Sequence, residues 1–167
     1  MTSVRRPARL TLVRPHYVGA VYGSLVAASV VASTAADGTP LPPPDLAVAL
    51  VGTGIAFWVA HVYARVVGEG VVTSILLTER VWQAAVGEWP MVEAAMPPAA
   101  IALLGWAVGL GAGAITMLAL CIAIAGQVGW AVLASTRAGL SRRWIVGSGL
   151  VNLAVGMLIL LLETSLH

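Results

Sequence analysis

The uncharged apolar stretch over residues 98–135 constrains the fold more than any other feature of the sequence. As one straight helix it would extend ~57 Å, nearly twice the ~30 Å thickness of the hydrocarbon core of a bilayer. Gly109, Gly111 and Gly113 lie in its middle and weaken a helix there. We therefore predict two membrane spans, over residues 99–112 and 116–134, with one long span as the alternative.

The composition assigns the whole chain to the membrane. Hydrophobic residues make up 59% of it, charged residues only 10%, and the mean hydropathy is +0.94. A soluble domain carries about 25% charged residues. A lipid bilayer is the solvent that suits this composition, so we predict an all-α polytopic transmembrane helical bundle.

Three further apolar runs are long enough to cross the hydrocarbon core: residues 17–36, 46–67 and 144–162. The first run follows an arginine-rich segment and resembles a secretion signal, but it is long for one, so we interpret it as a retained span. Residues 37–44 are rich in proline and predict a loop. Residues 1–167 then form a single transmembrane domain with about five spans.

Residues 71–89 predict a different kind of helix. Glu79, Arg80 and Gln83 lie on one side of it, opposite an arc of apolar residues. This arc consists of Val71, Ile75, Trp82, Val86 and Trp89. We predict an amphipathic helix on the cytoplasmic membrane surface, with Trp82 and Trp89 as interfacial anchors.

The positions of the nine basic residues, all arginine, predict the topology. With five spans every arginine faces the cytoplasm, whereas with four spans one group of arginines lies outside. We therefore expect a multi-pass protein of the plasma (inner) membrane, with its N-terminus in the cytoplasm and its C-terminus outside.

Four spans each carry one polar side chain in the inner half of the membrane, as judged from the distance to the nearest arginine. These are Tyr22, His61, Gln127 and Asn152. They predict a polar pocket or pore in which His61 is the titratable member. The alternative is that they form hydrogen bonds that hold the helices together. No predicted span carries an acidic residue near its centre, which argues against a proton-coupled or cation-coupled pathway.

Glycine pairs at a spacing of four predict closely packed helices, either within one chain or between copies. The candidates are Gly19 with Gly23 and Gly105 with Gly109.

Motifs for catalysis are missing: the sequence has no HExxH, CxxC, P-loop or GxSxG pattern. Its single cysteine, Cys121, lies in an apolar run without a metal-ligand partner. We therefore predict no enzyme activity, no cofactor, no metal site and no nucleic-acid partner.

Three stretches together carry a resemblance: Phe57-Trp-Val-Ala-His-Val-Tyr-Ala64, Glu88-Trp-Pro-Met-Val-Glu-Ala-Ala95 and Arg137-Ala-Gly-Leu-Ser141. They resemble a group of small, uncharacterised bacterial integral membrane proteins. The resemblance implies a multi-pass fold and no particular activity.

For function, the leading expectation is a small homo-oligomeric channel or transport-type protein of the lipid bilayer. The alternative is a non-catalytic partner that regulates or helps to assemble another membrane protein.

Overall fold

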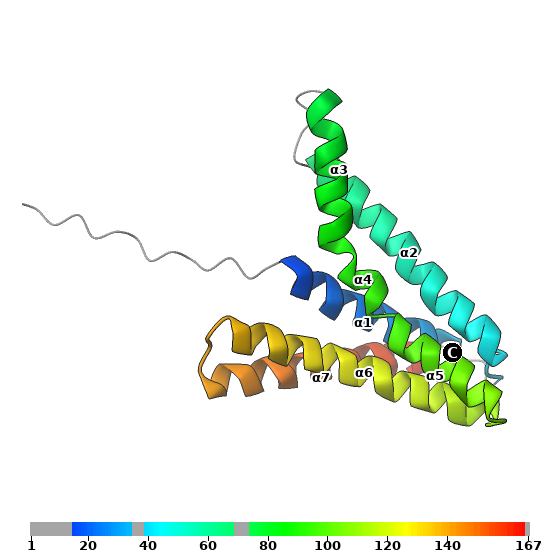
Figure 1. Ribbon diagram of the computed structural model, residues 1–167. Coiled ribbons are helices and arrows are strands. Elements are labelled where there is room, and N and C mark those ends of the chain that lie inside the picture. The colour runs from blue at the N-terminus through cyan, green and yellow to red at the C-terminus, as the bar shows by residue number, and fades with distance from the viewer. Residues whose placement is uncertain (1–14, 35–38, 69–73, 166–167) are drawn as a thin grey trace, which may run out of the picture.

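The computed structural model describes residues 15–34, 39–68 and 74–165 of the chain, and all of their regular structure is helical (Figure 1). The prediction of an all-α fold is confirmed. The helices are α1 (Pro15–Ser33), α2 (Pro43–Gly68), α3 (Ser74–Glu88), α4 (Pro90–Glu93), α5 (Met96–Ala107), α6 (Ala112–Arg137) and α7 (Arg142–Ser165).

Two of these helices, α2 and α6, are long and apolar enough to cross a membrane, with 26 residues each. The apolar part of α1, Tyr17–Ser33, is shorter. Helix α2 begins at Pro43, within the loop predicted over residues 37–44. Proline is tolerated in the first turn of a helix, because the backbone nitrogens there have no hydrogen-bond partner within the helix.

The helices pack in an up-and-down order. Helix α1 lies along α6, and α6 lies along α7, while α2 lies along α3 and α5. Figure 1 shows that α2 and α3 lean away from α6 and α7 toward one end of the molecule. The core where α1, α2, α5 and α6 meet is rich in alanine, including Ala27, Ala28, Ala102, Ala119 and Ala123. Small side chains let helix backbones approach closely, as is typical of membrane bundles.

The helix breaks within residues 98–135, as its glycines predicted, but the break lies at residues 108–111, inside the predicted first span of residues 99–112. Gly109 has a φ angle of +77°, which only glycine adopts without strain. The N–H of Leu110 donates to the carbonyl of Gly105 at 2.9 Å, and the N–H of Gly109 donates to Trp106 at 3.0 Å. This pair of bonds is a Schellman motif, which ends α5 and lets α6 begin at Ala112.

The region between Ser74 and Ala107 differs from the prediction of a surface helix followed by a separate span. Helices α3, α4 and α5 follow one another with Trp89, Ala94 and Ala95 all in the right-handed helical region. The prolines lie in the first turns of α4 and α5, so they interrupt the hydrogen bonds without reversing the chain. The result is one broken helix, whose middle part carries the half-buried Glu88 and the exposed Glu93.

Candidate functional site

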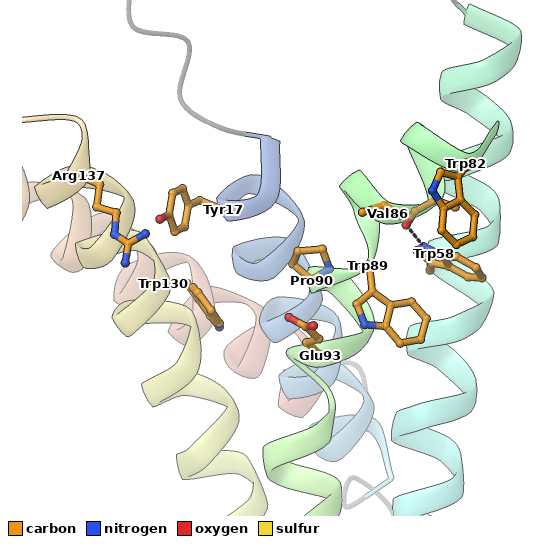
Figure 2. A pocket seen from close by; sticks show the side chains of 10 residues that line it. Tyr17, Trp58, Trp82, Val86, Trp89, Pro90, Glu93, Trp130 and Arg137 are labelled. Carbon is orange, nitrogen blue, oxygen red and sulfur yellow. Dashed lines mark hydrogen bonds between the residues drawn. The ribbon is translucent and has the colours of Figure 1, made fainter. Parts of the chain in front are cut away.

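A pocket of about 670 Å³ lies where α1, α2, α3, α4 and α6 face one another (Figure 2). Four of the six tryptophans of the chain line it, so we call it the tryptophan pocket. Its lining residues are Tyr17, Trp58, Trp82, Ala85, Val86, Trp89, Pro90, Glu93, Trp130 and Arg137.

Helix α3 supplies one wall. Trp82, Val86 and Trp89 follow at spacings of four and three, which places them on one helix face. They belong to the apolar arc of the predicted amphipathic helix. These three members of the arc line the pocket, whereas Val71 lies outside the described residues. The two tryptophans predicted as interfacial anchors are exposed.

Helix α2 supplies Trp58, whose orientation is fixed by two contacts. Its indole Nε1 donates a hydrogen bond to the backbone oxygen of Ala85 at 2.8 Å. Its ring meets that of Trp89 edge to face, with centroids 5.5 Å apart and an interplanar angle of 87°. Edge-to-face pairs of this kind hold aromatic rings in place, and both rings border the cavity.

Helix α6 supplies the opposite wall. Trp130 and Arg137 are seven residues apart, which puts them on the same face two helical turns, or ~10 Å, from each other. Tyr17 of α1 lies beside both: its ring centroid is 6.4 Å from that of Trp130, and the Arg137 guanidinium carbon is 5.8 Å from it. The arginine thus makes a cation–π contact at this end of the pocket.

The two carboxylates of this region differ in their partners. Glu88 has a side chain only 16% exposed and pairs with Arg65 of α2, at 3.0 Å between Oε1 and Nη1. Glu93 lines the tryptophan pocket and makes no hydrogen bond or ion pair with the residues that the structure describes. Both lie in the middle of the broken helix, whereas the predicted spans left them outside.

Three of the predicted packing glycines lie at helix contacts. Gly19 and Gly23 face α4: a Cβ on Gly23 would lie 2.8 Å from the Met91 Cα and overlap the Met91 carbonyl oxygen. Gly105 faces Ile115 of α6, with 2.8 Å between a built Cβ and Cγ1. Gly109 has nothing within 4 Å and serves the turn instead.

The four predicted polar residues form two pairs, and none of them lines the tryptophan pocket. The rings of Tyr22 and His61 lie 5.1 Å apart, and His61 Nδ1 is 3.0 Å from the backbone oxygen of Phe57. The fully buried Gln127 donates from Nε2 to the backbone oxygen of Asn152 at 2.6 Å. Tyr22 and Asn152 also line a groove of about 370 Å³ between α1, α6 and α7.

Sequence reasoning did not select Trp58, Trp130, Glu93 or Arg137 as site residues. One signal could have found three of them: the stretches 57–64, 88–95 and 137–141 all reach the tryptophan pocket, through Trp58, Trp89 with Glu93, and Arg137. Far apart in sequence, these stretches meet in one place (Figure 2).

Comparison of the chain with protein-family models, with curated proteins and with solved structures finds no match. Within the described residues there is no group of three or more His, Cys, Asp or Glu side chains that could hold a metal ion.

Proposed function

We propose that the chain is a five-span protein of the inner membrane that receives a small amphiphilic molecule in the tryptophan pocket, as part of a transport-type function. The observation that carries this proposal is the convergence of four tryptophans, a carboxylate and a guanidinium on one cavity of about 670 Å³. Small-molecule sites are of this size, mostly apolar and aromatic, with a few polar groups that fix orientation.

The arrangement of the helices supports a five-span topology. The contact of Arg137 with Tyr17 brings the end of α6 beside the beginning of α1. The chain reverses direction between α1 and α2, between α2 and the broken helix α3–α5, at the α5–α6 turn and at the α6–α7 turn. With the arginine-bearing ends in the cytoplasm, the N-terminus lies inside, the C-terminus lies outside, and the pocket opens on the cytoplasmic side.

The polar pairs have other roles in this proposal. The bond from Gln127 to the backbone of α7 supports the interpretation that this pair holds helices together. Tyr22 and His61 stay candidates for a polar path, which a homo-oligomer would complete from several copies.

The test is uptake of amphiphilic dyes by liposomes that contain the purified full chain, with cationic, anionic and zwitterionic dyes compared. We expect uptake above that of empty liposomes, reduced in Trp89→Ala and unchanged in Trp106→Ala, because Trp106 is exposed on α5 away from the pocket. No uptake of any dye by folded protein would overturn the proposal and favour a non-catalytic partner of another membrane protein.

A further inference from the structure

We infer that the tryptophan pocket selects a lipophilic organic cation, held by the ring faces of its tryptophans and by the carboxylate of Glu93. This inference names the ligand class of the proposed function and rests on it.

The first argument is the charge of Glu93. Its neighbour Glu88 is already balanced by Arg65, but Glu93 has no such partner within the described part of the chain. Its helix α4 packs against Gly23, eight residues or ~12 Å along α1 from Pro15. The Glu93 side chain is exposed on the protein and borders the pocket, so its surroundings at that depth are the pocket and the membrane interior. A carboxylate without a counter-charge is costly in such surroundings, and a bound cation would reduce the cost.

The second argument is the aromatic lining. The face of an aromatic ring carries negative potential, and tryptophan attracts cations more strongly than tyrosine or phenylalanine does. Trp58, Trp89 and Trp130 border the same cavity as Glu93. One cation–π contact already exists at the edge of the pocket, where the Arg137 guanidinium lies over the Tyr17 ring.

Arg137 does not make the pocket a site for anions. It lies in the last turn of α6, where the helix carbonyls favour a positive charge, and its side chain is exposed. Figure 2 shows it beside Tyr17, with Glu93 beneath Pro90 on the other side of Trp130. Its charge is therefore accounted for by the helix end and by the Tyr17 ring, whereas that of Glu93 is not.

The third argument is size and hydration. A cavity of about 670 Å³ with aromatic walls is far larger than a metal ion needs, and the described residues offer no cluster of metal ligands. A bulky cation with aromatic or alkyl substituents is weakly hydrated and fills such a space by apolar contact. The ligand class is thus a quaternary ammonium, a phosphonium or a protonated alkylamine with aromatic substituents.

Two probes of equal shape and opposite charge test the inference: tetraphenylphosphonium and tetraphenylborate. Their binding to the full chain in detergent is measured by equilibrium dialysis. We expect wild type to bind the phosphonium, and Glu93→Gln to weaken binding by about tenfold or more. The matched control Glu79→Gln removes an exposed carboxylate outside the pocket that accepts a hydrogen bond from Gln83, and should change binding less than about twofold.

A second pair of variants tests the aromatic part. Trp130→Leu should weaken phosphonium binding, whereas Trp106→Leu should not, because Trp106 lies outside the pocket. If Glu93→Gln lowers the thermal stability of the protein, Glu93→Asp replaces it: this variant keeps the charge and should bind more tightly than Glu93→Gln.

The outcomes separate the inference from the proposed function. Phosphonium binding that Glu93→Gln leaves unchanged would overturn the inference. Preferred binding of the borate that Trp130→Leu abolishes would also overturn it, yet leave a working amphiphile pocket. Binding of neither probe to folded protein would overturn both.

Discussion

At the scale of the residue, Gly23 sets how closely α1 approaches α4, the helix that carries Glu93. We predict that Gly23→Ala lowers the free energy of unfolding by about 1–3 kcal/mol, because the new methyl group meets rigid backbone of Met91 rather than a side chain that can move. Thermal unfolding in detergent, followed by circular dichroism, measures the change.

The matched control is Gly52→Ala in α2. Nothing lies within 4 Å of a Cβ at this position, so the alanine should leave stability unchanged or raise it by up to about 1 kcal/mol through its better helix propensity. Equal effects of the two substitutions would contradict the close α1–α4 contact.

Gln127 shows what could be predicted of a single residue. Counting from the flanking arginines predicted nearly equal heights for Gln127 and Asn152, and the Gln127 side chain does meet the backbone of Asn152 in α7. Its bond partner could not be predicted, because the count says nothing of how each helix is rotated. The side chain of Asn152 turns back to the carbonyl of Ser148 on its own helix, and its backbone oxygen receives the bond from Gln127.

At the scale of the element, the α5–α6 and α6–α7 turns use the same device. Gly109 and Gly139 have φ angles of +77° and +70°, and each is followed by a leucine whose N–H donates back to the last helical turn. We predict that Gly109→Ala lowers the free energy of unfolding by about 1–2 kcal/mol, the cost of a left-handed alanine. Chemical denaturation in detergent tests this.

Gly113→Ala is the control for that turn. Gly113 lies within α6, and a Cβ there meets nothing within 4 Å, so this alanine should not destabilise the protein. If Gly109→Ala unfolds at the same denaturant concentration as wild type, the left-handed turn is not required.

The elements themselves were largely predictable from apolar length and glycine content, with one instructive exception. Glycines at 109 and 111 predicted the break between α5 and α6 correctly. Prolines at 90, 97 and 98 mark the first turns of α4 and α5, but Trp89, Ala94 and Ala95 stay in the right-handed helical region, so the chain does not reverse there. A proline excludes one hydrogen bond, and only packing decides whether the helix then bends or ends. Glu93 lies in the middle of the broken helix α3–α5 because the chain continues in one direction past Pro90.

At the scale of the whole molecule, the tryptophan pocket depends on helix pairs that no local pattern encodes. Its walls come from α1, α2, α3, α4 and α6. Among these helices, α2 and α3 lean away from α6 (Figure 1). Periodicity placed Trp82 and Trp89 on one helix face, but it could not say whether that face meets lipid or protein. Only the tertiary packing places Trp58 and Trp130 opposite them.

The proposed cytoplasmic opening of the pocket depends on the membrane topology. Two introduced cysteines can test this topology. In a Cys121→Ala background, Thr39→Cys lies in the exposed α1–α2 connection and Ser141→Cys in the exposed α6–α7 turn. Five spans place these positions on opposite sides of the membrane, because three passes, α2, α3–α5 and α6, then lie between them. A single span over residues 98–135 would place both on the same side.

Intact cells that express each variant are treated with a membrane-impermeant maleimide. We expect Thr39→Cys to react and Ser141→Cys to stay unlabelled until detergent opens the membrane, because positive-inside topology keeps the Arg137–Arg143 turn in the cytoplasm. Labelling after detergent shows that both thiols are reactive, so protection reports the side and not burial. Reaction of both variants in intact cells would instead put the α6–α7 turn outside, and the tryptophan pocket would then face away from the cytoplasm.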